Sequence, residues 1–168
     1  MKHTLSVVTE DRPGVLARVA SLCARRGFNI HSLAVGPIHE PDRSRITLVV
    51  DAAQVEQVTK QLHKLIHVIK ITELEVEESV EREVMLLRVN GNGHRAEVMD
   101  AAAPFEARVV DASGASVAFE VAGHPRDLAA FLETMRPFGV TDLVKSGRIA
   151  LARAKPAPDP DKQVRRHR

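Results

Sequence analysis

The sequence contains no tryptophan, no tyrosine and only five phenylalanines among its 168 residues. Proteins that bind single-stranded nucleic acids stack the bases on aromatic side chains, and few such side chains are present here. Residues 153–168 carry six basic and two acidic side chains, so the remaining residues have a net charge of −2. A folded nucleic-acid-binding domain carries its basic excess on the domain itself. The composition therefore argues against a nucleic acid partner.

Cysteine and long apolar runs are also scarce. The single cysteine, Cys23, excludes an internal disulfide and a cysteine-rich metal site. It lies among apolar residues at helical spacing, so we expect a buried thiol. No stretch approaches the roughly 18 to 20 apolar residues that span a bilayer, and no charged-then-apolar leader opens the sequence. We therefore expect a cytoplasmic protein with no membrane partner.

The motifs of common enzymes are missing as well. The sequence has no G-x-S-x-G, H-E-x-x-H, Walker A or Rossmann pattern, so no catalytic residue is predicted. His63 and His67 have the spacing of two metal ligands on one helix face, but the predicted helix ends between them. No third ligand is nearby, so we expect no metal site. The glycines of residues 91–94 lack the lysine of a phosphate-binding loop and predict a strand-to-helix turn.

Residues 9–33 organise the rest of the chain. A turn at residues 11–14 follows a short strand and precedes an amphipathic helix, for which Asp11 is a plausible cap. Gly27 is placed to end this helix. An apolar stripe at helical spacing runs along it, made of Val15, Leu16, Val19, Leu22 and Cys23. A helix that starts at a glycine-containing turn has free N–H groups suited to a small carboxylate or phosphate.

Hydrophobic periodicity predicts the same order of elements twice. The first half has strands at 3–9, 28–38, 44–50 and 68–76, with helices at 14–26 and 53–65. The second half has strands at 82–89, 107–111, 116–122 and 140–152, with helices at 95–105 and 125–135; the last strand is interrupted near residues 146–147. The predicted fold class is α+β, with two tandem ferredoxin-like βαββαβ units. We assign residues 1–78 and 79–152 to the units and 153–168 to a disordered, proline-rich basic tail.

The start of the first helix also offers groups that fit a free α-amino acid. The N–H groups of Gly14, Val15 and Leu16 are placed to hold a carboxylate. Asp11 is suited to an ammonium group, and the Asn29 amide can both donate and accept. Structural roles compete with this interpretation: a helix cap, a loop glycine and a turn residue. Taken alone, these residues favour the structural roles.

Two segments carry a resemblance to a known family. They are residues 10–19, Glu-Asp-Arg-Pro-Gly-Val-Leu-Ala-Arg-Val, and residues 26–33, Arg-Gly-Phe-Asn-Ile-His-Ser-Leu. Together they closely resemble the ACT domain of acetolactate synthase small subunits. Residues 44–45, 61–65, 81–83 and 85–86 extend the resemblance, which covers about residues 1 to 152.

The resemblance implies a non-catalytic regulatory subunit. Such a subunit activates the thiamine-diphosphate-dependent catalytic subunit and confers feedback inhibition by valine on branched-chain amino-acid biosynthesis, with leucine or isoleucine as variant effectors. Thiamine diphosphate, magnesium and FAD are then expected on the large catalytic subunit and no cofactor on this chain. The family pairs its ACT domains as homodimers with the effector between them. The corresponding effector-binding positions here are Asp11, Gly14, Val15, Leu16, Asn29 and Ile30.

One position differs from the usual family sequence. Many family members have asparagine at the position of Asp11, and the extra negative charge here leaves the affinity for the effector open.

Two alternative functions remain at this stage. The chain could instead be a stand-alone ACT-type sensor that regulates transcription or another enzyme. A free-standing enzyme with the ferredoxin-like fold is the other alternative, although no acid–base or nucleophile constellation supports it.

Overall fold

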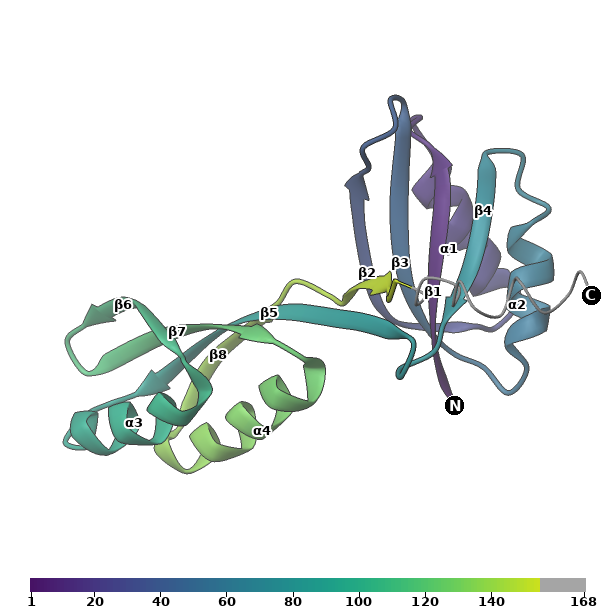
Figure 1. The fold of residues 1–168 in the computed structure, drawn as a ribbon. Coiled ribbons are helices and arrows are strands. Elements are labelled where there is room, and N and C mark those ends of the chain that lie inside the picture. The colour runs from purple at the N-terminus through teal and green to yellow at the C-terminus, as the bar shows by residue number, and fades with distance from the viewer. Residues whose placement is uncertain (155–168) are drawn as a thin grey trace, which may run out of the picture.

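The computed structural model describes residues 1–154 and shows two α+β units joined by one long strand and by a second segment that returns beside it (Figure 1). The part of the predicted basic tail from residue 155 onward lies outside the described residues. Within residues 1–154, no helix combines the length and the hydrophobicity needed to cross a membrane.

The first unit is a four-stranded antiparallel sheet with both helices on one face. Its elements are β1 (Lys2–Glu10), α1 (Val15–Arg25), β2 (Asn29–Pro37), β3 (Arg43–Asp51), α2 (Val55–Leu62) and β4 (Val68–Leu74). The strand order is β2-β3-β1-β4, so β2 lies at one edge. The register pairs Lys2 with Asp51 at one end of the sheet and Glu10 with Arg43 at the other.

The second unit repeats this topology, which confirms the predicted pair of βαββαβ units. It comprises β5 (Ser79–Asn90), α3 (Arg95–Ala102), β6 (Arg108–Ser113), β7 (Ser116–Gly123), α4 (Pro125–Met135), β8 (Val140–Lys145) and β9 (Ile149–Ala152). The sheet order is β6-β7-β5-β8. The predicted interruption is present because the chain leaves the second sheet after β8, and β9 pairs instead with residues 79–82 of β5.

The chain therefore passes between the units twice, outward along β5 and back along β9. Strand β9 contacts β1 and β4 of the first sheet. Thr4 and Ser6 alternate with the core residues Leu5 and Val7 and so face away from the helices, yet they are only 5% and 7% exposed. The paired segments of β5 and β9 thus lie on the face of the first sheet that α1 and α2 leave open.

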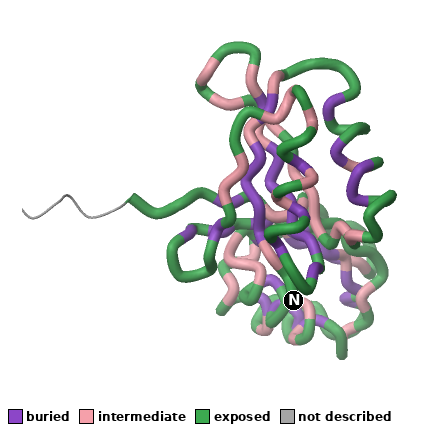
Figure 2. Tube along the Cα trace, turned by 90° about the vertical axis from the view of Figure 1, so that its right-hand side faces the viewer, coloured by how far each residue is buried: buried purple, intermediate pink, exposed green. Residues whose placement is uncertain are grey.

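Each unit has its own core, and the buried positions follow the central strands and the inner helix faces (Figure 2). The first core is aliphatic, with Leu5, Val19, Leu48 and Val58 completely buried. The second contains Phe131, whose ring packs edge-on against Phe105 and Phe119 at centroid distances of 5.3 and 6.0 Å. Such edge-to-face contacts are a favoured geometry for aromatic rings.

Helix α1 ends as predicted but does not begin as predicted. Gly27 has a φ of 71°, and the N–H of Phe28 bonds to the Cys23 carbonyl at 2.9 Å, which is the glycine-terminated Schellman arrangement. The predicted capping role of Asp11 is wrong, because Gly14 occupies the N-cap position and no side chain accepts a capping hydrogen bond. Leu16, predicted to belong to the buried stripe, is 41% exposed.

Cys23 is completely buried in the first core, and burial raises the pKa of its thiol. A raised pKa lowers the fraction of the reactive thiolate at neutral pH. We expect the native protein to react with Ellman's reagent far more slowly than the protein in denaturant, where one thiol per chain should react at once. Stoichiometric labelling of the folded protein within seconds would contradict this burial.

Candidate effector site and the contact between the units

The start of α1 provides one half of the predicted effector site. Gly14 adopts a left-handed conformation with a φ of 83°, and a Cβ there would meet nothing within 4 Å. The backbone is therefore open to approach. A helix N-terminus has a partial positive charge and unpaired N–H groups, both of which favour a carboxylate. This end of α1 can hold the acidic group of a small ligand.

The neighbouring predicted residues differ in how far they are exposed. Val15 is only 5% exposed, and its N–H donates to the carbonyl of Arg12 at 3.4 Å. Asp11 and Leu16 are exposed. At this end of the sheet, an acidic and an apolar side chain are therefore open to a ligand, whereas Val15 belongs to the core.

Asn29 and Ile30 lie at the opposite end of the same sheet. Asn29 begins β2 and is in register with Asp51, whose partner on β1 is Lys2. The loop that leads to Gly14 instead leaves β1 at Glu10, eight residues away, which is about 26 Å of extended strand. The structure thus divides the six predicted residues into two separate groups. One chain alone cannot bring the two groups together.

Charged groups surround the Asn29 end. The carboxylate of Asp51 accepts a hydrogen bond from the N-terminal ammonium group at 2.7 Å. This hydrogen bond, aided by the positive charge of the ammonium group, lowers the pKa of Asp51. Lys2 Nζ and His31 Nε2 lie 2.8 Å apart beside it.

The two histidines considered as metal ligands do not share a helix. Both follow the end of α2 at Leu62, and His67 Nδ1 lies 3.1 Å from Glu10 Oε2. In the described part of the chain, no three His, Cys, Asp or Glu side chains are grouped as metal ligands.

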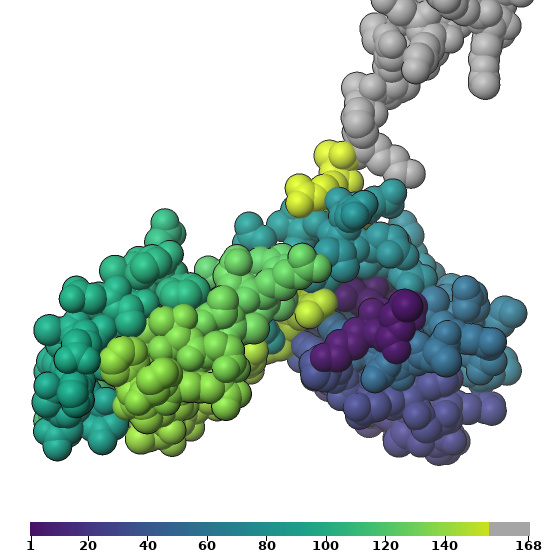
Figure 3. Space-filling model, turned by 90° about the horizontal axis from the view of Figure 1, so that it is seen from below, coloured from purple at the N-terminus to yellow at the C-terminus, as the bar shows by residue number. Residues whose placement is uncertain are grey.

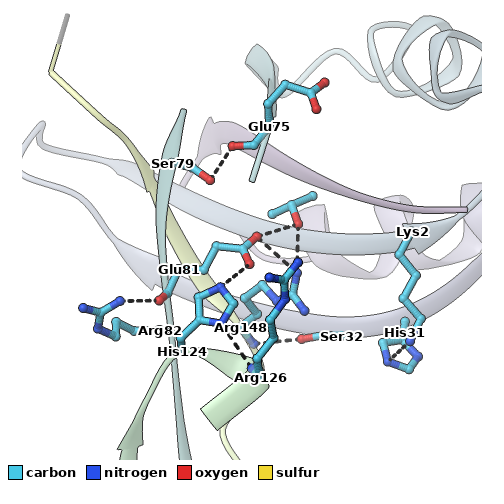
Figure 4. A network of polar contacts seen from close by, with 11 residues as sticks. Lys2, His31, Ser32, Glu75, Ser79, Glu81, Arg82, His124, Arg126 and Arg148 are labelled. Carbon is cyan, nitrogen blue, oxygen red and sulfur yellow. Dashed lines mark hydrogen bonds and ion pairs between the residues drawn. The ribbon is translucent and has the colours of Figure 1, made fainter. Parts of the chain in front are cut away.

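A buried carboxylate joins the two units (Figure 4). Glu81 lies at the start of β5, and its side chain is only 3% exposed. Its Oε1 accepts from Thr4 Oγ1 at 3.0 Å and from Arg148 Nη1 at 3.1 Å. Thr4 belongs to β1, and Arg148 belongs to the segment between β8 and β9. Because a buried charge requires such partners, this group fixes β5 to the first sheet.

Two hollows flank this contact. One is a cleft of about 710 Å³ lined by Lys2 and His31 of the first unit and by Arg126 and Lys145 of the second. In Figure 3 the first residues of the chain, in purple, face the second unit across a hollow. The other is a groove of about 410 Å³ between the end of β2, at residues 34–38, and the β5–β9 pair; Ile38 directly follows β2.

The contact around Glu81 was not predicted from the sequence, although a signal for it exists. Met85, Leu87 and Val89 occupy alternate positions of β5 and face the second core. Glu81 and Glu83 continue this alternation toward the start of the strand. Period-two alternation therefore indicates that both acids point inward. No local sequence pattern indicates which residues Glu81 and Glu83 contact.

Comparisons with known proteins agree along both units. A model described as an AHAS small subunit-like ACT domain matches residues 5–70, and one described as the small subunit of acetolactate synthase matches residues 82–154. The acetolactate synthase small subunits of Mycobacterium bovis and Mycobacterium leprae are each 51% identical over 154 residues; the matches cover 90% of this chain and 92% and 91% of the relatives. The crystal structure of the Thermotoga maritima small subunit matches with a TM-score of 0.85 at 31% identity, covering 92% of this chain and 99% of that one.

The first unit is therefore an ACT domain, and the described residues form a regulatory chain built from an ACT domain and a second ferredoxin-like unit. Its relatives share both parts in the same order. The chain belongs to the acetolactate synthase small-subunit family. Membership in this family implies association with a catalytic subunit.

Proposed function

We propose that this chain binds a branched-chain amino acid, with valine as the main effector, and thereby inhibits acetolactate synthase. Without the effector it supports the active state of the large catalytic subunit, which carries thiamine diphosphate, magnesium and FAD. The complex works in the cytoplasm and opens the synthesis of branched-chain amino acids. Inhibition requires valine to bind the two states of the complex with different affinities, since tight binding alone shifts no equilibrium.

The observation that carries this proposal is the separation of the two halves of the site. Strand β2 lies at the edge of its sheet, so its outer N–H and C=O groups are available to a second chain. If two β2 edges pair antiparallel about a two-fold axis, Asn29 of one chain lies near the Pro37 end of the other. Pro37 pairs with Ser44, beside the loop that leads to Gly14. A homodimer of this kind completes two identical sites.

The chemistry of the completed site suits valine. The N–H groups of Gly14 and Leu16 at the start of α1 would take the carboxylate, since the Val15 N–H already donates to Arg12, and Asp11 would take the ammonium group. Leu16 and Ile30 would contact the branched side chain. A methylene group in an apolar pocket discriminates by only about 1–3 kcal/mol, so leucine and isoleucine are expected to bind more weakly rather than not at all.

Asn29→Ala is expected to weaken valine binding about tenfold, because it removes a hydrogen bond worth roughly 1.4 kcal/mol to the bound amino acid. Gly14→Asp should weaken it at least as much, since a carboxylate then occupies the place of the ligand's own. Isothermal titration of the purified chain with valine, leucine, isoleucine and threonine measures both effects.

Asn92→Ala is the matched control, because Asn92 is exposed in a turn of the second unit. Its valine affinity should equal that of the wild type. The proposal is wrong if Asn29→Ala and Gly14→Asp both leave valine binding and valine inhibition of the reconstituted enzyme unchanged.

A further inference from the structure

The segment of residues 146–148, called the corner below, rests directly on β2. Gly147 has a φ of 82°, and a Cβ built on it would lie 2.6 Å from the carbonyl oxygen of Leu33. The next backbone N–H, that of Arg148, donates to Ser32 Oγ at 2.8 Å. The corner joins β8 to β9 in the second half of the chain. Two consecutive residues of β2, Ser32 and Leu33, thus support a turn whose residues lie 114 and 116 positions further along the chain.

The side chain of Arg148 extends the contact to two more strands. Its Nη1 donates to Glu81 Oε1 at 3.1 Å and to Thr4 Oγ1 at 3.3 Å. The Arg148 side chain is 20% exposed and that of Glu81 only 3%. Breaking a pair as buried as this leaves a charge without compensation, so intermediate positions of the corner are strongly disfavoured. The corner therefore has few stable arrangements.

His124 brings α4 to the same carboxylate. Its Nδ1 accepts a hydrogen bond from the N–H of Arg126 at 3.1 Å and so caps α4. An Nδ1 that accepts must be unprotonated, which places the proton of the neutral ring on Nε2. That Nε2 lies 3.8 Å from Glu81 Oε2. Elements from both units thus converge on Glu81 (Figure 4).

The register of β2 is irregular where the effector residues meet the corner. Ile30 pairs with Val50 and Ser32 with Val49, so a bulge lies between them. A bulge interrupts the hydrogen-bond ladder and lets a strand bend locally. Movement of Asn29 or Ile30 can therefore reach Ser32 and Leu33 without breaking the rest of the sheet.

We propose that the corner and Glu81 form the coupling element of this protein. Effector binding on β2 shifts Ser32 and Leu33, the corner follows through Gly147 and Arg148, and Glu81 passes the shift to β5 and α4 of the second unit. This inference rests on the proposed function and adds the route by which occupancy reaches the second unit. Coupling of this kind is a difference in binding free energy between two states, and it is reciprocal.

The test measures the dissociation constant of valine twice for each variant, once for the full chain alone and once with its catalytic subunit bound. The ratio of the two constants is the coupling factor, expected to be about fivefold or more for the wild type. Arg148→Met should reduce this factor to nearly one while the isolated chain keeps its valine affinity. Ser32→Ala should reduce it as well, and this variant leaves no buried charge unpaired should Arg148→Met fold poorly.

Ser146→Ala is the matched control. Its hydroxyl also lies in the corner, but it accepts the N–H of Val84 and donates to the Gly147 carbonyl instead of bonding to β2 or Glu81. The backbone bond from the Ser146 N–H to the Val84 carbonyl remains in this variant. This variant should keep the wild-type coupling factor. Wild-type coupling in both Arg148→Met and Ser32→Ala, or an equal loss in Ser146→Ala, would overturn the inference and leave the proposed function intact. A wild-type chain that binds no branched-chain amino acid, alone or in complex, would overturn both.

Discussion

Replacing Glu81 with alanine is expected to lower the free energy of unfolding by about 3 kcal/mol, because it leaves Arg148 partly buried without its counter-charge. It also removes the acceptor of the Thr4 hydroxyl, which is buried at the same place. For a chain of this size the loss corresponds to a fall in melting temperature of about 6–12 °C. Differential scanning calorimetry of the wild type and the Glu81→Ala variant in the same buffer measures this fall in melting temperature.

Glu133→Ala provides the comparison. Glu133 forms an ion pair with Arg136 at 2.9 Å, but both side chains are more than 60% exposed. Exposed pairs of this kind contribute about 0–1 kcal/mol. Equal losses in the two variants would mean that Glu81 is not the buried anchor described above.

Gly147→Ala is expected to have the second large effect. An alanine with a φ near 80° is strained by roughly 1–2 kcal/mol, and its Cβ would also overlap the Leu33 carbonyl oxygen. Crowding of this kind costs about 1–3 kcal/mol more, or moves the corner off β2. Displacement of the corner frees the Arg148 N–H from Ser32, and crowding with the corner in place lowers the free energy needed to open this hydrogen bond. Amide hydrogen exchange at Arg148 should therefore be much faster in the variant.

Gly27→Ala is the control that separates the backbone strain of an alanine at positive φ from the overlap of its Cβ with a neighbouring atom. Gly27 has a φ of 71°, but a Cβ there meets nothing within 4 Å. It should therefore show the backbone strain alone and leave the exchange rate of the Arg148 amide unchanged. The same loss of stability in both variants, with slow exchange at Arg148 retained, would show that Gly147 does not press against β2.

The topology could be predicted because each element is set by its own residues. Leu5 and Val7 of β1 and Leu128, Phe131 and Met135 of α4 have the periods of a half-buried strand and of an amphipathic helix. The left-handed Gly27 marks a helix end by local backbone chemistry alone. Such signals need no knowledge of the rest of the chain.

The features that could not be predicted from the sequence depend on parts of the chain that are distant from the residues concerned. Leu16 has helical spacing to the core residues of α1, but it is exposed while Val15, Val19, Leu22 and Cys23 are buried. Asp11 has the right chemistry for a cap, but Gly14 takes the position. The hydrogen bond between Arg148 and Ser32 joins residues 116 positions apart, and no pattern in the corner or in β2 indicates it.

The double crossing between the units decides how they can move. A single connecting segment would act as a swivel, whereas β5 and β9 form a hydrogen-bonded ribbon. Stretching or shearing a ribbon breaks ladder hydrogen bonds, but torsion about its length continues the twist that strands already have. Torsion of the β5–β9 ribbon is therefore the relative motion of the units that keeps its ladder hydrogen bonds. Strand β6 lies two strand spacings from β5, about 10 Å, so a small torsion of the ribbon moves this edge of the second sheet further than it moves β7.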